Sequence, residues 1–110
     1  MDKPQIKLNP LEKTAIKVPT EKIAKELMRI FEIGGLNWRN GKVPDGIGFW
    51  KTYKEDSCVG FEEDKILYSS KGWFDELCVK TISAKKYYKL QPEVTKKKRA
   101  EINAYFESLK

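Results

Sequence analysis

The stretch TEKIAKELMRIFEIGGLNWRNGK, residues 20–42, carries the clearest structural pattern in the chain. Its apolar residues recur at a spacing of three or four, which predicts one apolar stripe along an amphipathic helix. The stripe consists of Ile23, Leu27, Ile30 and Phe31. Thr20 is the expected N-cap, because its side-chain oxygen can accept from a free amide of the first turn. Gly34 and Gly35 are expected to end the helix, with Gly35 in the left-handed conformation.

The residues after this helix predict a short strand followed by a loop. Leu36 and Trp38 alternate with polar residues, which places both side chains on the face that the helix covers. We therefore expect Trp38 to be part of the core. Asn40-Gly41 is a strong turn signal, and residues 43–48 have the composition of a loop.

Further strands are predicted on both sides of this stretch. Residues 13–19 alternate weakly and end at a proline, which indicates a short strand. Residues 57–61 and 65–70 indicate a hairpin whose tip is acidic. Residues 77–83 are rich in β-branched side chains and indicate another strand.

Two shorter patterns predict helices near the C-terminus. Ser83 is expected to cap a helix over residues 84–90, and Pro92 is expected to begin a final helix. The final helix has an apolar stripe formed by Ile102, Tyr105, Phe106 and Leu109. Because turns separate the strands after residue 36, the predicted class is α+β. The expected architecture is a small, mostly antiparallel sheet packed by an amphipathic helix, with a C-terminal helix.

The chain of 110 residues suits one domain. We assign this domain to residues 13–110, and we expect residues 1–12 to be a flexible or loosely packed arm. The longest apolar runs are too short to cross a membrane, and the first residues lack the apolar core of a secretory signal. No membrane partner is expected, and a cytoplasmic location is predicted.

The composition argues against most catalytic chemistry. The chain has no histidine, which excludes Ser-His-Asp and Cys-His catalysis and histidine-ligated zinc. Cys58 and Cys78 are expected to be reduced and buried. The glycines of residues 46–48 do not form a known phosphate loop, and the carboxylates of residues 55–64 fit no calcium loop. We therefore expect no enzymatic activity, no cofactor and no metal.

The net charge of +6 is concentrated in one segment. Residues 85–99, KKYYKLQPEVTKKKR, contain seven basic residues and one acidic residue. Lysine and arginine can neutralise phosphates while tyrosine offers a stacking face, so this segment is a candidate site for an anionic partner. The candidate residues are Lys85, Lys86, Tyr87, Lys89, Lys96, Lys97 and Arg99. The alternative is a solvated helix face that has no partner.

Two pairs of adjacent aromatic residues are candidates for an interface. Phe49-Trp50 and Trp73-Phe74 would point to opposite sides of an extended chain, so one member of each pair could be exposed. Exposed tryptophan favours binding hot spots. The alternative is that both pairs only pack the core of a small domain.

The spacing of Gly35, Trp38 and Gly41, between a helix and a hairpin, resembles small uncharacterised early or accessory proteins of tailed phages. The resemblance covers roughly residues 14–90 and implies no catalytic residues. It implies a non-enzymatic protein that binds a host protein and inhibits or redirects it, with counter-defence as one such role, in the cytoplasm of the host cell. The alternative function is a nucleic-acid or nucleotide-binding module that uses residues 85–99. The oligomeric state is left open.

Overall fold

The computed structural model describes residues 3–9, 11–44 and 46–110. Five strands form one sheet in the order β2-β4-β3-β1-β5. Their bounds are Thr14–Lys17 for β1, Asn37–Trp38 for β2, Ser57–Glu62 for β3, Lys65–Ser70 for β4 and Lys80–Ser83 for β5.

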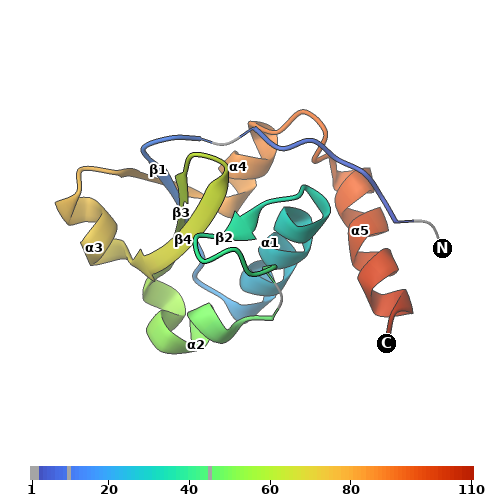
Figure 1. Ribbon diagram of the computed structural model, residues 1–110, viewed down its shortest axis with the longest axis horizontal. Coiled ribbons are helices and arrows are strands. Elements are labelled where there is room, and N and C mark those ends of the chain that lie inside the picture. The colour runs from blue at the N-terminus through green and yellow to red at the C-terminus, as the bar shows by residue number, and fades with distance from the viewer. Residues whose placement is uncertain (1–2, 10, 45) are drawn as a thin grey trace.

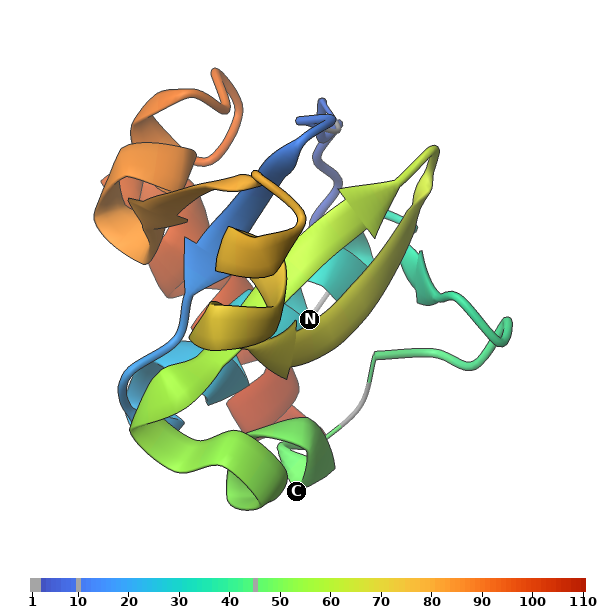
Figure 2. The ribbon, with the colours of Figure 1, turned by 90° about the vertical axis from the view of Figure 1, so that its left-hand side faces the viewer.

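Helices cover the two faces of this sheet unequally. They are α1 (Glu21–Ile33), α2 (Gly48–Tyr53), α3 (Lys71–Glu76), α4 (Ala84–Lys89) and α5 (Lys96–Ser108), and a 3₁₀ turn η1 (Lys54–Asp56) follows α2. The main core lies between the sheet and α1, and α5 packs beside α1 (Figure 1). Figure 2 shows α3 on the opposite face, where a small second cluster of Ala15, Cys58 and Phe74 is buried.

The α+β class is confirmed, but the sheet is mixed and not mostly antiparallel. The predicted hairpin exists, since β3 and β4 pair antiparallel, and β1 also pairs antiparallel with β3. In contrast, β5 runs parallel to β1, and β2 runs parallel to β4. The prediction failed because α2 and α3 lie between strands that were expected to be joined by turns. The helix α3 carries the chain back across the sheet from β4 to β5, which run in the same direction, and α1 does the same between β1 and β2.

The predicted boundaries of the first helix are confirmed. The Thr20 hydroxyl accepts from the Ile23 amide at 3.2 Å, so one free donor of the first turn is satisfied. At the other end Gly34 keeps helical angles, and Gly35 has a φ of +80°. Glycine adopts this conformation without the strain that a Cβ would cause.

The aromatic pairs lie in helices and not in the extended segments that the sequence predicted. Phe49 and Trp50 belong to α2, and Trp73 and Phe74 belong to α3. Neighbours on a helix project about 100° apart, so one helix can bury its phenylalanine and leave its tryptophan at the side. Phe49 and Phe74 are accordingly buried.

Two further N-caps determine where the helices α4 and α5 begin. Ser83 accepts from the Lys86 amide at 3.1 Å, which confirms the predicted start of α4. The final helix begins later than predicted: Thr95 is its N-cap and accepts from the Lys98 amide at 3.1 Å. Pro92 lies in the preceding turn and not in the first turn of the helix. The Thr95 hydroxyl decides where α5 begins, because it satisfies a free amide of the first turn, which a proline side chain cannot do. Of the predicted stripe, Ile102 is buried whereas Leu109 is exposed.

The N-terminal segment packs against the domain over its described residues. Ile6 and Leu8 are buried in the main core. The Asn9 amide donates to Oε1 of Gln91 at 2.7 Å, and Nε2 of Gln91 donates back to the Asn9 carbonyl at 2.9 Å. The expectation of a loosely packed arm is therefore wrong here, because two apolar side chains and a buried glutamine hold the segment in place.

The two cysteines differ in their environments, and no disulfide joins them. Cys58 is buried under α3, as predicted. Cys78 is exposed, which corrects the expectation of burial. It lies in the turn between α3 and β5, with a φ of +59°, and is not part of the predicted strand.

Candidate functional site

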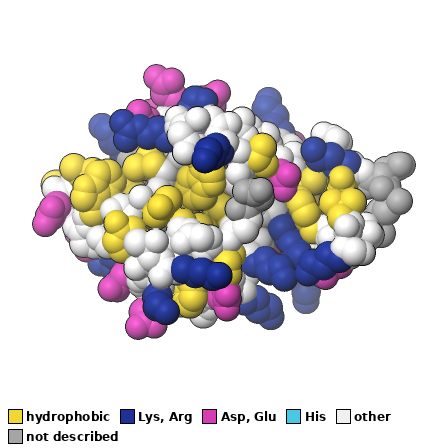
Figure 3. Space-filling view, turned by 60° about the horizontal axis from the view of Figure 1, so that its bottom comes forward, with side chains coloured by type: hydrophobic (Ala, Val, Ile, Leu, Met, Phe, Trp, Pro, Cys, Tyr) yellow, Lys and Arg dark blue, Asp and Glu magenta, His cyan; other side chains and the backbone are white. Residues whose placement is uncertain are grey.

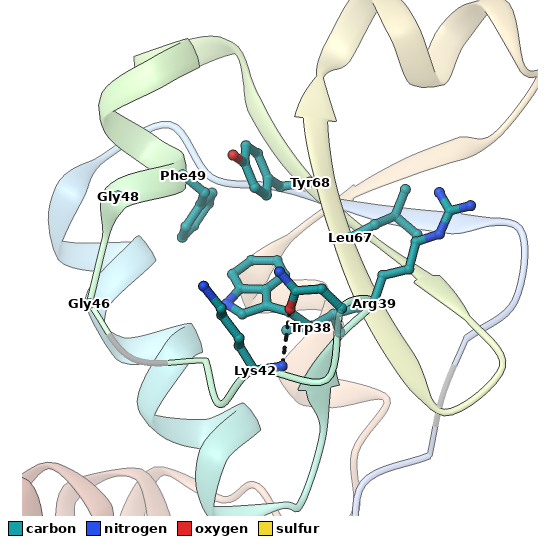
Figure 4. A pocket seen from close by; sticks show the side chains of 10 residues that line it. Trp38, Arg39, Lys42, Gly46, Gly48, Phe49, Leu67 and Tyr68 are labelled. Atoms are coloured by element: carbon teal, nitrogen blue, oxygen red, sulfur yellow. Dashed lines mark hydrogen bonds between the residues drawn. The ribbon is translucent and has the colours of Figure 1, made fainter.

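An open groove lies beside β2 and β4 at the edge of the sheet. Its volume is about 800 Å³. Four segments form its walls: the turn after β2, the loop before α2, the start of α2, and β4 (Figure 4). The lining residues are Trp38, Arg39, Asn40, Lys42, Gly46, Gly48, Phe49, Ile66, Leu67 and Tyr68. We call this hollow the aromatic groove.

Three aromatic rings meet in the groove. The Trp38 and Tyr68 centroids are 5.5 Å apart, and the Phe49 centroid is 5.6 Å from each of them. Phe49 is buried, whereas Tyr68 is 42% exposed. Trp38 is only partly buried and packs against the main core, so its predicted place in the core is confirmed in part. It packs against the core from the groove side because β2 is an edge strand, and α1 covers Leu36 more completely.

A tight turn fixes the polar rim of the groove. The Trp38 amide donates to the Lys42 carbonyl at 2.8 Å, and the Gly41 amide donates to the Trp38 carbonyl at 2.7 Å. Gly41 has a φ of +87°, which confirms the turn predicted at Asn40-Gly41. The Asn40 side-chain oxygen accepts from the Lys42 amide at 3.0 Å (Figure 4). These bonds fix the turn from which the side chains of residues 39, 40 and 42 extend.

The rim is positively charged. Lys42 extends beside the rings toward the open side of the groove, while Arg39 extends away past Leu67 (Figure 4). The Arg39 Nε lies 3.5 Å from a Glu62 carboxylate oxygen, and both side chains are largely exposed, so this pair is weak. Lys42 has no ion pair within the described parts of the chain. Figure 3 shows hydrophobic side chains gathered on this side of the molecule, with Lys and Arg side chains beside them.

The basic segment 85–99 is only partly gathered into one place. Lys85, Lys89 and Arg99 line a second hollow of about 350 Å³ between α4 and the start of α5, which we call the basic hollow. Lys86, Lys96 and Lys97 are exposed but do not line it.

Tyr87 cannot serve as the predicted stacking face, because it is fully buried. Its ring lies 6.0 Å from Phe31 and 5.7 Å from Phe61 in the core. Burial also raises the pKa of its hydroxyl above the ordinary range. The helical spacing explains the error: Lys85, Lys86 and Lys89 occupy the solvent side of α4, which leaves Tyr87 on the opposite side.

Arg99 is held by neighbouring groups. Its guanidinium lies 4.7 Å from the centre of the Tyr88 ring. It donates to the Val94 carbonyl at 3.1 Å and lies 3.8 Å from a Glu26 carboxylate oxygen. The residue therefore links the turn before α5 to α1, and its charge is shared with Glu26.

The predicted interface aromatics separate into buried and exposed members. Phe49 and Phe74 are buried, and Trp50 is partly buried with its indole nitrogen bonded to Val18. Trp73 is 40% exposed. Burial corrects the expectation of a direct interface role for the two phenylalanines, although Phe49 still forms the back of the groove.

The site residues that sequence reasoning missed are Trp38, Tyr68, Arg39 and Lys42. The adjacent turn signal at Asn40-Gly41 was the one hint, since loops beside an edge strand often carry binding residues. Tyr68 follows Leu67 in the alternating pattern of an ordinary half-buried strand, and this pattern does not indicate a binding residue.

Possible metal ligands and comparisons with known proteins indicate no further functional site in the described parts of the chain. Among the described residues, no three carboxylate or cysteine side chains lie together as metal ligands would. None of the helices in the described chain has the length and apolar character to span a membrane. No protein-family model, curated protein or solved structure matches this chain.

Proposed function

We propose that this protein is a non-enzymatic accessory protein of the phage type, and that it binds and inhibits or redirects a host component through the aromatic groove. The observation that carries the proposal is the meeting of Trp38, Phe49 and Tyr68 in an open groove with Arg39 and Lys42 at its rim. Tryptophan, tyrosine and arginine are the residues that contribute most to binding surfaces.

The chemistry of the groove supports binding over catalysis. Its described lining includes no carboxylate and no cysteine, and the chain has no histidine. A general base or an activated nucleophile is usually drawn from these residue types. The rings and the fixed turn instead offer a preformed surface, which lowers the entropic cost of binding.

The test compares what the native protein and its groove variants retain from a host-cell lysate. Tyr68→Ala and Lys42→Glu change exposed side chains of the groove, and Lys51→Glu is the matched control because Lys51 is exposed on α2 outside the groove. We expect one specific component to bind the native protein and the control, and to be lost from both groove variants. Equal retention by all four proteins would exclude the groove as the binding site.

The convergence of Lys85, Lys89 and Arg99 on the basic hollow favours a second candidate, a nucleic-acid or nucleotide-binding module. If several phosphates are neutralised there, affinity for an oligonucleotide should fall steeply as salt rises. The double variant Lys85→Glu, Lys89→Glu should reduce both the affinity and the salt dependence. Unchanged binding in that variant would leave the segment as a solvated surface.

A further inference from the structure

Two rings of the aromatic groove are open to a ligand. The Trp38 and Tyr68 planes meet at 72°, with centroids 5.5 Å apart, and the buried Phe49 closes the corner behind them. A flat ring can lie against one of these faces while its edge meets the other, which is the arrangement that aromatic pairs prefer. The rings therefore suit a planar group more than a branched aliphatic side chain.

The side chains at the rim are donors of hydrogen bonds. Arg39 and Lys42 have donors only. Asn40 already uses its side-chain oxygen to accept from the Lys42 amide, and its NH₂ group remains. A ligand that joins a planar ring to an acceptor-rich, negatively charged group would satisfy both parts of the groove.

The edge of β2 is closed to an added peptide strand. The Trp38 amide, which points away from β4, already donates to the Lys42 carbonyl, and the Trp38 carbonyl accepts from the Gly41 amide. Peptides that add a strand need such main-chain groups to be unpaired. The β2 wall of the groove thus lacks the main-chain contacts by which an extended peptide is usually held.

We propose that the aromatic groove binds a nucleotide unit, with the base against Trp38 and Tyr68 and the phosphate at Lys42. This inference rests on the groove being the binding site, and it names the chemistry of the component bound there. Stacking on aromatic rings next to cationic side chains is how single-stranded nucleic acid is commonly held. The volume of about 800 Å³ lies within the usual range for ligand pockets.

The experiment measures fluorescence polarisation of a labelled single-stranded oligothymidylate, with unlabelled AMP and oligothymidylate as competitors. Tyr68→Ala should weaken binding roughly tenfold through the missing stacking face, and Trp38→Phe, which keeps a ring, should lose less. Lys42→Glu should also lower the slope of log affinity against log salt by about 1, relative to native. Lys51→Glu reverses the same charge outside the groove and should leave affinity within about twofold. Circular dichroism melting establishes that each variant is folded.

The competitors distinguish two sources of the same chemistry. Competition by AMP at concentrations similar to those of the oligonucleotide would identify a free nucleotide as the ligand, and competition by the oligonucleotide alone would identify a nucleic-acid strand. Absence of binding by the native protein, or equal loss in Lys42→Glu and Lys51→Glu, overturns the inference. So does loss only in Lys85→Glu, Lys89→Glu, which would place binding in the basic hollow.

A failed inference is distinguishable from a failed proposed function. If the native protein binds no nucleotide but retains a host protein that Tyr68→Ala loses, the groove is the binding site and its ligand is a protein. If the groove variants retain the same material as the native protein, and no nucleotide binds, both proposals are wrong.

Discussion

The indole nitrogen of Trp50 donates a hydrogen bond to the main-chain oxygen of Val18 at 3.0 Å. Val18 follows β1 and is buried, whereas Trp50 lies on α2. The bond ties α2 to the central part of the sheet, and α2 in turn carries Phe49 at the back of the aromatic groove. The shape of the groove therefore depends on a contact made outside it.

Replacing Trp50 with phenylalanine should lower the free energy of unfolding by about 1–2 kcal/mol, since the Val18 oxygen loses its donor. Trp73→Phe is the matched control, because Trp73 is exposed and should change stability by no more than about 0.5 kcal/mol. Urea unfolding followed by circular dichroism measures both. Equal stability of the two variants would show that the Trp50 bond contributes nothing.

Gly60 is required by the packing of α3 on the sheet. A Cβ at this position would lie 2.6 Å from Cε1 of Phe74 and 3.0 Å from Cζ. Gly60→Ala should therefore displace Phe74 and cost roughly 1–3 kcal/mol of stability. Gly72→Ala serves as the contrast: a Cβ at Gly72 would meet no side chain and no other part of the chain outside α3 within 4 Å, and alanine in α3 should stabilise by about 0.5–1 kcal/mol. A Gly60→Ala protein that unfolds at the native urea concentration would contradict this packing.

Glu107 makes stability depend on acid pH. Its pKa is lowered from 4.5 to about 2, first by the hydrogen bond from Arg29 and then by that from Lys110. A lowered pKa in the folded state means that this contribution is present above the unfolded value and is lost as the pH falls. We expect the native unfolding free energy to decline between pH 4.5 and about 2 more steeply than that of Glu107→Gln. Glu76→Gln, on an exposed residue, should keep the native slope; the same slope in all three proteins would contradict the coupling.

The elements that could be predicted from the sequence are those with local signals. The stripe and caps of α1, the hairpin, and Ser83 before α4 depend on residues close together in the chain, and all are confirmed. The helices α2 and α3 have only six residues each, with a glycine and adjacent aromatics that have low helix propensity. Tertiary burial of Phe49 and Phe74 stabilises them, and no local pattern reports that burial.

The groove and the parallel pairings were missed for a related reason. Trp38 and Tyr68 are brought together by the pairing of β2 with β4. Pairing between segments that are distant in the chain produces no periodic pattern of apolar residues in the sequence. The positive charge of residues 85–99 is evident from the sequence, but the burial of Tyr87 and the contacts of Arg99 depend on how α4 and α5 pack. Charge and composition alone could not separate the free lysines from these two residues.

The two thiols should react at very different rates. Burial raises the pKa of Cys58 from 9.0 to about 11, so at neutral pH its thiolate is scarce as well as inaccessible. Cys78 is exposed. Titration of the folded protein with dithiobisnitrobenzoate should detect one thiol per chain, and addition of denaturant should release the second. Cys78→Ser should then show no fast reaction, whereas fast reaction in that variant would mean that α3 opens readily from the sheet.

Arg99 should stabilise the fold, although it lies in the segment considered for binding. Its guanidinium packs on the Tyr88 ring and donates to the Val94 carbonyl. Because glutamine can replace neither the cation over the ring nor the full reach of the guanidinium, Arg99→Gln should cost roughly 1–2 kcal/mol of stability.

Lys96→Gln is the matched control for this change, since both substitutions remove one positive charge. Lys96 is exposed, and its replacement should change stability by less than about 0.5 kcal/mol. Urea unfolding at two salt concentrations separates the causes, because a general charge effect is screened by salt while the interactions of a partly buried guanidinium are screened much less. A difference between the two variants that persists at high salt identifies Arg99 as a structural residue. A binding defect in Arg99→Gln would then reflect displacement of Tyr88 and of the wall of the basic hollow. Equal stability of the two variants would instead show that Arg99 does not stabilise the fold, and that its charge is available to a partner.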